Sequence, residues 1–199
     1  MQLDWTGNKT AIFTAHGASN HSEKERAERD YYATDPEAVK KLLEVEDFSD
    51  YIWENAVGGG HIASVLEEAG YTVLSTDIVD RGYKNTKIAD FLKVDYNNNF
   101  DGDIITNPPY KYAAEFVEQS VKSVSYGHKV AMLLKLTFLE GQKREKLFKK
   151  YPPKKIYVFS KRINCFFNGI MDNKASSAVA YAWFVWEKGY NGKPVIDWI

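Results

Sequence analysis

Short apolar runs alternate with stretches of helical periodicity along most of this sequence. Each run is bounded by glycine, proline or polar residues, which predicts a buried strand. Between two of these runs, Ile62, Val65, Leu66 and Ala69 recur at helical spacing and predict a helix with one apolar face. Strands are expected at 51–54, 71–76, 103–106, 129–135, 154–159 and 178–186.

Strands that alternate with helices predict an α/β fold with a mostly parallel sheet and helices on both faces. The run 178–186 is expected to pair with the strand before it as an antiparallel C-terminal hairpin, with Trp183 and Trp186 packing at the sheet edge. Residues 1–30 are polar or densely charged, which predicts an N-terminal arm followed by one domain at 31–199. Near the start of that domain, Thr34 or Asp35 is expected to cap a helix that Pro36 opens.

Bulk composition limits the class of protein. The chain has 199 residues, enough for about one domain, and its net charge of −1 excludes the global basic field of a nonspecific DNA coat. The single cysteine, Cys165, excludes an internal disulfide and a cysteine-based zinc site, and it indicates a reducing compartment. No apolar run reaches membrane-spanning length. We therefore expect a cytoplasmic monomer or weak dimer with no metal and no membrane partner.

A glycine-rich turn follows the strand 51–54, with glycines at positions 58, 59 and 60. Glycines let the backbone approach a ligand that a Cβ atom would block. The next strand ends in Asp77, roughly 20 residues further on, where an acidic residue can accept both hydroxyls of a ribose. Gly58, Gly60, Asp77 and the adjacent Ile78 are therefore the expected cofactor-binding residues of a Rossmann-like unit.

The strand 103–106 leads directly into Asn107-Pro108-Pro109-Tyr110. Open α/β sheets bind ligands at the carboxyl ends of their strands, and two prolines fix the backbone there. An amide side chain, an oriented carbonyl and an aromatic face suit a flat group that carries an amine. They offer two acceptors for the amine hydrogens and a ring on which the flat group stacks.

This strand followed by NPPY resembles the catalytic motif of S-adenosylmethionine-dependent amino-methyltransferases, above all the DNA adenine-N6 methyltransferases. The small, Dam-like enzymes of phages and prophages are the kind that it resembles most, which implies a bacterial host cell. The family's acidic-x-small-x-Gly-x-Gly loop is matched at Glu54, Ala56, Gly58 and Gly60.

The chain also departs from the family pattern: Asn55 and Val57 stand where many relatives have proline and cysteine. The departures spare the glycines, so cofactor binding is still expected.

The resemblance implies a class I methyltransferase fold with a seven-stranded sheet, and S-adenosylmethionine as the cofactor. An aromatic-x-Thr segment in relatives lines the methionine end of the cofactor, which assigns that role to Tyr31, Tyr32 and Thr34. The family's D-F-L element reads the adenine amine of the cofactor and packs on its ring, which points to Asp90 and Phe91. Asp90 as a simple helix cap is the alternative.

The implied substrate is DNA, expected to be double-stranded, with the target adenine flipped out of the stack. Asn107 and the Pro108 carbonyl are expected to accept the amine hydrogens, Pro109 to fix the motif, and Tyr110 to stack on the base. The loop 162–177 is the candidate for base-edge recognition. The expected phosphate contacts are Lys143, Arg144, Lys146, Lys149, Lys150, Lys161 and Arg162, for which a solubilising surface is the alternative.

Other readings stay open at this point. Cytosine-N4 methyltransferases use a similar core, but commonly begin with the catalytic strand. Glutamine-N5 methyltransferases of release factors share NPPY, but carry an N-terminal helical domain. RNA adenine is a further substrate, and a relic that binds nucleic acid without methylating it is the non-enzymatic alternative.

Overall fold

A computed structural model describes residues 32–93, 100–167 and 179–199. Four α-helices cover a sheet in this part of the chain, with α3 at Pro36–Val45, α4 at His61–Glu68, α5 at Ala113–Ser123 and α6 at Gln142–Lys150. Two short 3-10 helices are η1 at Tyr110–Tyr112 and η2 at Leu136–Leu139. The strands are β1 Tyr32–Thr34, β2 Tyr51–Glu54, β3 Thr72–Asp77, β4 Lys87–Ile88, β5 Asp103–Thr106, β6 Lys129–Lys135, β7 Lys155–Val158, β8 Cys165–Phe167, β9 Tyr181–Glu187 and β10 Val195–Trp198.

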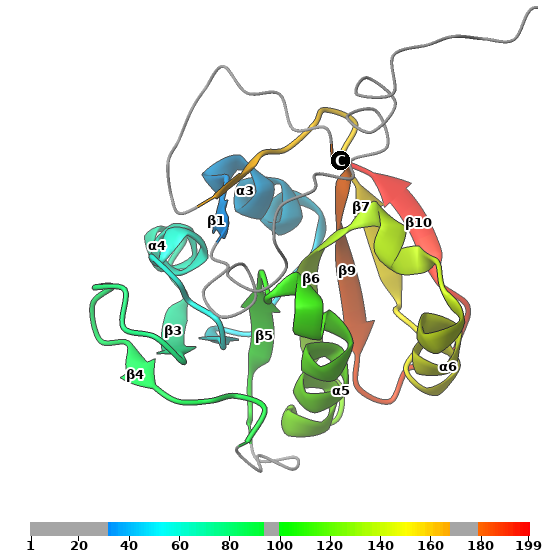
Figure 1. Ribbon diagram of the computed structural model, residues 1–199, viewed down its shortest axis with the longest axis horizontal. Coiled ribbons are helices and arrows are strands. Elements are labelled where there is room, and N and C mark those ends of the chain that lie inside the picture. The colour runs from blue at the N-terminus through cyan, green and yellow to red at the C-terminus, as the bar shows by residue number, and fades with distance from the viewer. Residues whose placement is uncertain (1–31, 94–99, 168–178) are drawn as a thin grey trace, which may run out of the picture. The chain divides into compact units, whose positions relative to one another are not determined.

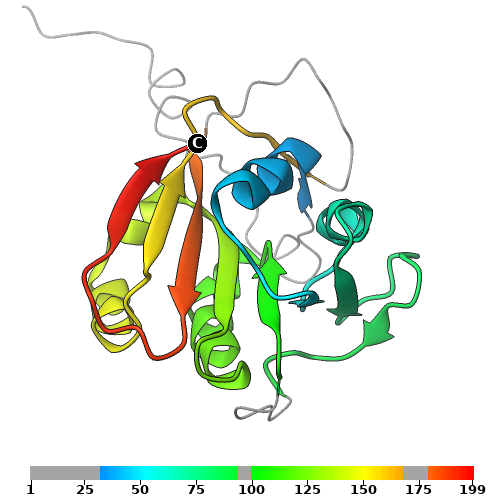
Figure 2. The same cartoon turned by 180° about the vertical axis from the view of Figure 1, so that it is seen from behind.

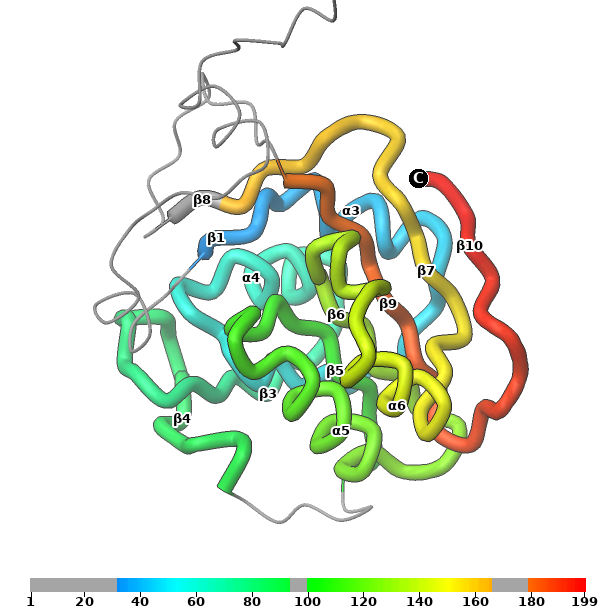
Figure 3. The backbone as a smooth tube through the Cα atoms, turned by 45° about the vertical axis from the view of Figure 1, so that its right-hand side comes forward, coloured from blue at the N-terminus to red at the C-terminus, as the bar shows by residue number. Residues whose placement is uncertain are grey.

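The main sheet has the strand order β10-β7-β9-β6-β5-β2-β3-β4. Neighbouring strands are parallel from β4 to β6, as expected for strands joined by helical crossovers, and β9 is antiparallel to both β6 and β7. Figure 3 follows this sheet from β4 at one edge to β10 at the other. The mostly parallel α/β sheet predicted from the sequence is confirmed.

The position of the C-terminal hairpin differs from the expectation. Strand β9 does pair antiparallel with β7, but it lies between β6 and β7 rather than at an edge. Trp183 and Trp186 are accordingly buried, at 0% and 1% exposure, and their indole nitrogens donate to the carbonyls of Ala38 and Tyr151. The prediction that they pack at an edge was wrong, because the edge belongs to β10, an eighth strand that the sequence pattern did not predict.

Helices cover both faces of the sheet (Figures 1 and 2). On one face α5 and α6 pack over a core that includes Trp53, Ile104 and Phe184. On the other face α3 and α4 pack over Ile52, Ile105 and Trp183. Successive strand residues therefore enter opposite cores, as the alternation of a doubly covered strand requires.

The first helix starts as its sequence predicts. Asp35 is its N-cap, and the Asp35 carboxylate accepts from the backbone N–H of Glu37 at 3.0 Å, with Pro36 in the first turn. Immediately before it, β1 pairs antiparallel with β8 as a separate two-stranded sheet. This pairing joins segments that are far apart in the sequence, and it was not predicted.

No described helix has the length and apolar character needed to cross a membrane. The predicted arm at 1–30, Tyr31 and most of the predicted recognition loop, from residue 168 to 177, lie outside the described residues.

Candidate active site

The glycine turn joins the carboxyl end of β2 to α4, and its geometry depends on glycine at two positions. Gly58 and Gly60 have positive φ angles of 55° and 81°, a region that side chains with a Cβ atom rarely adopt. A Cβ atom on Gly60 would also lie 1.9 Å from the ring of Tyr83. The turn therefore has no space for a side chain at Gly60, where the Tyr83 ring packs against the backbone.

Asp77 ends β3 directly beside this turn. Its Oδ2 accepts the backbone N–H of Gly58 at 2.8 Å, and its Oδ1 accepts that of Val79 at 2.9 Å. Each carboxylate oxygen has a second acceptor position, so the side chain can hold the turn and still accept from a ligand. Ile78 follows with 62% of its surface exposed and presents an apolar face next to that carboxylate.

Four buried side-chain oxygens in the described part of the chain have no hydrogen-bond partner. They belong to two pairs of consecutive residues. One pair lies at the carboxyl end of β2 and the other at the carboxyl end of β5, and these two strands are adjacent and parallel. Since unpaired buried polar atoms are costly and rare, their concentration here makes this edge of the sheet the candidate ligand site. The atoms are Glu54 Oε2, Asn55 Oδ1, Thr106 Oγ1 and Asn107 Oδ1.

Glu54 is 1% exposed and lies near Asp77. Burial raises the pKa of the Glu54 carboxyl well above its usual range, and the negative charge of Asp77 raises the pKa further, while a hydrogen bond from the Ala63 backbone opposes the shift. A buried carboxyl with a free oxygen suits a cationic ligand group, which would compensate for its desolvation. Ala56, in the turn that follows, is partly buried against the core on the α5 side.

The Asn107 amide is held from one side. Its Nδ2 donates to Thr34 Oγ1 at 3.0 Å and to the Tyr32 carbonyl at 3.4 Å, both in β1. A carbonyl only accepts, so this pairing requires the NH2 group to face β1 and turns Oδ1 away from it. That Oδ1 is one of the four unpaired atoms. Thr34 and Tyr32, expected from the resemblance to lie near the cofactor, thus orient the amide.

Tyr110 lies in an aromatic cluster at the same edge of the sheet. Its ring centroid is 5.7 Å from that of Tyr32 and 5.9 Å from that of Tyr181, and its hydroxyl donates to Cys165 Sγ at 3.7 Å. Burial raises the pKa of the Tyr110 hydroxyl and raises the pKa of the Cys165 thiol to about 11. These groups stay protonated at neutral pH and serve as packing surface and hydrogen-bond donors.

Asp90 and Phe91 follow β4, next to Asp77: the backbone N–H of Ala89 donates to the Asp77 carbonyl at 2.8 Å. Asp90 Oδ1 accepts the backbone N–H of Leu92 at 3.2 Å, and its Oδ2 pairs with Lys93 at 3.0 Å, so Asp90 caps the turn at 91–93 rather than a helix. Phe91 is 3% exposed, with its ring edge-on to Trp53 at 5.1 Å. The Phe91 ring is thus a core element of the protein, whereas its backbone lies in the turn after β4.

The predicted phosphate-binding cations differ in their surroundings. Lys143, Lys161 and Arg162 are exposed. Arg144 instead donates to the carbonyls of Thr137 and Glu140, each at 2.9 Å, and its guanidinium lies 4.9 Å from the centre of the Phe138 ring. Among the remaining predicted contacts, Lys149 and Lys150 form surface ion pairs with Glu145 and Glu118.

Three residues near NPPY were not assigned to the site from the sequence: Lys135, Cys165 and Tyr181. Lys135 ends β6, and its Nζ lies 5.0 Å from the centre of the Tyr110 ring. It is also paired in register with Tyr181 of β9. The signal for Lys135 was present, since a cation at the carboxyl end of a buried parallel strand stands where such sheets bind ligands. Cys165 and Tyr181 carried no comparable local signal.

No protein-family model and no curated protein matches this sequence. Solved structures resemble the fold. A predicted O-methyltransferase from Agrobacterium tumefaciens superposes with a TM-score of 0.60 at 12% identity, over 82% of this chain and 85% of the other. An S-adenosylmethionine-dependent O-methyltransferase from Thermotoga maritima gives a TM-score of 0.51 at 15% identity, over 79% and 66%. A protein described as a modification subunit of a type I restriction enzyme from Vibrio vulnificus gives a TM-score of 0.56 at 11% identity. The match covers 93% of this chain but only 48% of the Vibrio protein.

The fold is that of a class I methyltransferase. Within it, Glu54, Asp77 and Asn107 lie at the carboxyl ends of the adjacent strands β2, β3 and β5, with Thr34 bonded to Asn107 and Tyr110 packed against Tyr32. At these identities the likeness concerns the fold, and what this chain binds must be argued from its own residues.

Proposed function

We propose that this protein transfers a methyl group from S-adenosylmethionine to the exocyclic N6 amine of adenine in DNA. The observation that carries the proposal is the Asn107 amide, whose NH2 group is held by β1 while its buried Oδ1 has no partner. An acceptor fixed in this way can be satisfied by a donor on a ligand, and an amine is such a donor.

The residues at the glycine turn fit the proposed cofactor. The free Glu54 oxygen suits the ammonium of its methionine part, and the remaining acceptor positions of Asp77 suit the ribose hydroxyls. Ile78 offers an exposed apolar surface for the adenine. Gly58 and Gly60 give the close backbone approach. Completing the proposed cofactor set are Tyr31, Tyr32, Thr34, Ala56, Asp90, Phe91 and Asn107.

The proposed role of NPPY is to orient the target amine. When bound, S-adenosylmethionine supplies an electrophilic methyl group on a sulfonium. The lone pair of an adenine amine is delocalised into its ring, so the amine is a poor nucleophile. Asn107 Oδ1 and the Pro108 carbonyl accept its two hydrogens, draw the nitrogen toward tetrahedral geometry and hold it in line for transfer, with Pro109 fixing the backbone. Tyr110 supplies the stacking surface, a contact worth roughly 1–3 kcal/mol per base.

The burial of Asn107 Oδ1 bears on the substrate. A base within a duplex has its amine paired and stacked, so it reaches a buried acceptor only after it is flipped out. Exposed cations on the surface, Lys143, Lys161 and Arg162 among them, supply positive charge for phosphates. The restriction-modification neighbour supports DNA, and the glycine turn preceding NPPY in the chain favours adenine over cytosine.

The test is methyl transfer from labelled S-adenosylmethionine to unmethylated double-stranded DNA, with the product digested to nucleosides. We expect label in N6-methyldeoxyadenosine, and a loss of at least about a hundredfold in rate for Asn107→Ala, since orientation of the amine is removed. Asn191→Ala, on an exposed turn, is the matched control and should keep wild-type activity.

Three results would contradict the proposal. Label in N4-methyldeoxycytidine would move the target to cytosine. Label only in RNA or in a protein amide would move the substrate class. A wild-type protein that binds S-adenosylhomocysteine but transfers to none of these substrates would be a non-catalytic relic.

A further inference from the structure

Lys135 is a cation placed directly against the ring to which the proposed function assigns the target base. Its Nζ lies 5.0 Å from the centre of the Tyr110 ring, a cation–π geometry. The lysine ends β6, beside β5, whose carboxyl end carries Asn107. Its backbone is held in register with Tyr181, whose ring also contacts Tyr110. Two strands of the sheet therefore fix its position.

Among the described residues, no carboxylate forms an ion pair with Lys135. In the part of the chain that the structure describes, Lys135 makes no ion pair and no hydrogen bond through its side chain, although it is half-buried. The lysine at the other end of the same strand shows the contrast: Lys129 Nζ lies 2.6 Å from Glu46 Oε1. In a partly buried lysine whose described side-chain contact is a ring, the positive charge has no paired negative group among the described residues, so it favours an anionic ligand.

We propose that the Lys135 ammonium binds the backbone phosphate of the nucleotide whose base enters against Tyr110. The inference rests on the proposed function and adds a substrate-binding residue to it. An ammonium has donors only and acts as a point charge, which suits a phosphate oxygen. A base that stacks on Tyr110 presents its face to the ring, while its phosphate stays outside the stack, within reach of a flexible four-carbon side chain.

When substrate binds, the Lys135 ammonium exchanges the Tyr110 ring for the phosphate, and the contact with the ring prepares this exchange. In the substrate-free protein the ring holds the ammonium close to the site, so little side-chain freedom is lost when the phosphate arrives. As the base takes the ring face, the ammonium moves to the phosphate, where a charge-assisted contact replaces a weaker one. Lys135 thereby couples entry of the base to capture of its backbone.

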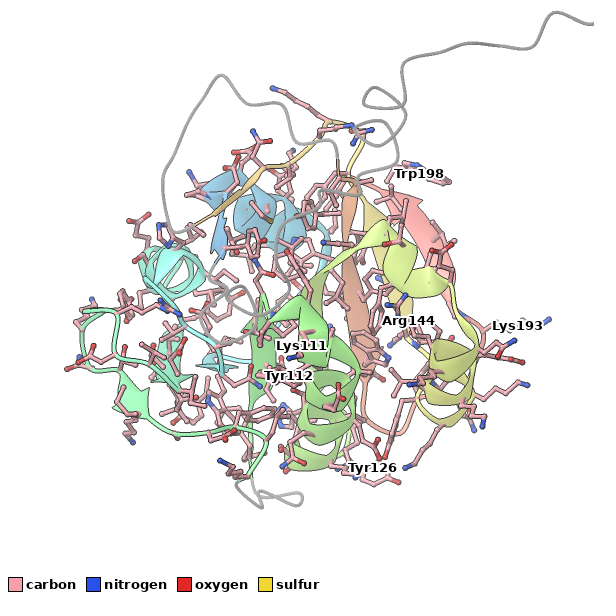
Figure 4. All side chains as sticks on the ribbon, viewed as in Figure 1. Lys111, Tyr112, Tyr126, Arg144, Lys193 and Trp198 are labelled. Carbon is pink, nitrogen blue, oxygen red and sulfur yellow. The ribbon has the colours of Figure 1, made fainter. Side chains whose placement is uncertain are left out.

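The experiment measures DNA binding across a range of salt concentrations, in the presence of S-adenosylhomocysteine, for wild type and three variants. Lys135→Met keeps the length of the side chain and removes the charge, whereas Lys135→Arg keeps the charge. Lys193→Met is the matched control: Figure 4 shows Lys193 at the β10 edge, well apart from Lys111 and Tyr112, which follow NPPY. Melting temperature and cofactor affinity are measured for each variant to confirm folding.

We expect Lys135→Met to weaken DNA binding by about tenfold at moderate salt, with cofactor affinity unchanged. The slope of log affinity against log salt should become shallower by about 0.9 for duplex DNA, or about 0.7 for a single strand, because one phosphate contact is lost. Lys135→Arg should keep the wild-type slope, and so should Lys193→Met.

An unchanged slope in Lys135→Met would overturn the inference while leaving methyl transfer, and so the proposed function, intact. A changed base preference at constant slope would also overturn it, since Lys135 would then contact a base edge. A wild-type protein that neither binds nor methylates nucleic acid would reject the inference and the proposed function together.

Discussion

At the scale of single residues, the site is distinguished by buried oxygens that the protein itself leaves unpaired. Glu54 and Asn107 stand on adjacent strands, and each has one buried oxygen without a donor. Neither the neighbouring positions of these residues nor their unpaired oxygens follow from the composition of the chain. The sequence placed both residues through motif spacing, and the structure adds which atom of each is available.

The Glu54 carboxyl makes stability depend on pH. Its folded-state pKa is raised by burial, and further by Asp77, above the unfolded value of about 4.3. The folded state therefore binds this proton more tightly than the unfolded state, so the contribution of Glu54 to stability is greatest below pH 4.3 and is lost as the pH rises through the folded pKa. We expect Glu54→Gln to unfold at higher urea concentration than wild type at pH 8, with the difference shrinking toward pH 4.

The exposed Glu68→Gln variant, outside the site, is the control for this measurement. If the wild type and Glu54→Gln kept the same difference across the whole range, Glu54 would titrate normally in the folded protein. The isosteric amide also separates charge from shape, because it keeps the volume of the side chain in the buried site.

At the scale of elements, the glycine turn between β2 and α4 tests how the cofactor site is built. Gly60→Ala combines two penalties, a positive φ of 81° and a Cβ atom 1.9 Å from the Tyr83 ring. Gly70 has a φ of 97° with nothing within 4 Å of a Cβ atom, so Gly70→Ala carries the backbone penalty alone. We expect Gly70→Ala to cost about 1 kcal/mol of stability and Gly60→Ala clearly more, with weaker S-adenosylhomocysteine binding.

Removing the Tyr83 ring separates the two penalties. In a double-mutant cycle, Gly60→Ala should be better tolerated in a Tyr83→Ala background, by roughly 1–3 kcal/mol, because the overlap with the ring is gone. Urea unfolding measures each corner of the cycle. Additive effects would mean that the turn shifts freely away from Tyr83 and that the overlap is harmless.

Elements were predicted well where the pattern is local. The runs at 51–54, 103–106 and 129–135 are strands β2, β5 and β6, because the central residues of each run are apolar and buried under both helical layers. Strand β10 was missed because it lacks this pattern: Val195, Ile196 and Trp198 are exposed, and Asp197 interrupts them. The pairing of β1 with β8 depends on segments remote in sequence, which periodicity does not register.

At the scale of the whole molecule, the fold and the proposed cofactor site are separate predictions. The parallel sheet follows from alternating strands and helices, whereas the interior position of β9 follows from pairing on both of its sides, which no local pattern encodes. Likewise, Asp77 was located by its distance from the glycines, but the placement of Lys135 over Tyr110 emerges only when β5 and β6 lie side by side.

Cofactor binding should stabilise the whole domain by mass action. S-adenosylhomocysteine at about a hundred times its Kd adds about 2.7 kcal/mol, which for a domain of this size raises Tm by roughly 5–10 °C. We expect Asp77→Asn to reduce this shift to under about 2 °C, since the amide presents one acceptor oxygen where the carboxylate has two, while Asn191→Ala should keep it. Differential scanning calorimetry over a series of ligand concentrations measures the effect. A wild-type protein whose Tm does not move would retain the methyltransferase fold without its cofactor, and catalysis at Asn107 would then have no methyl donor.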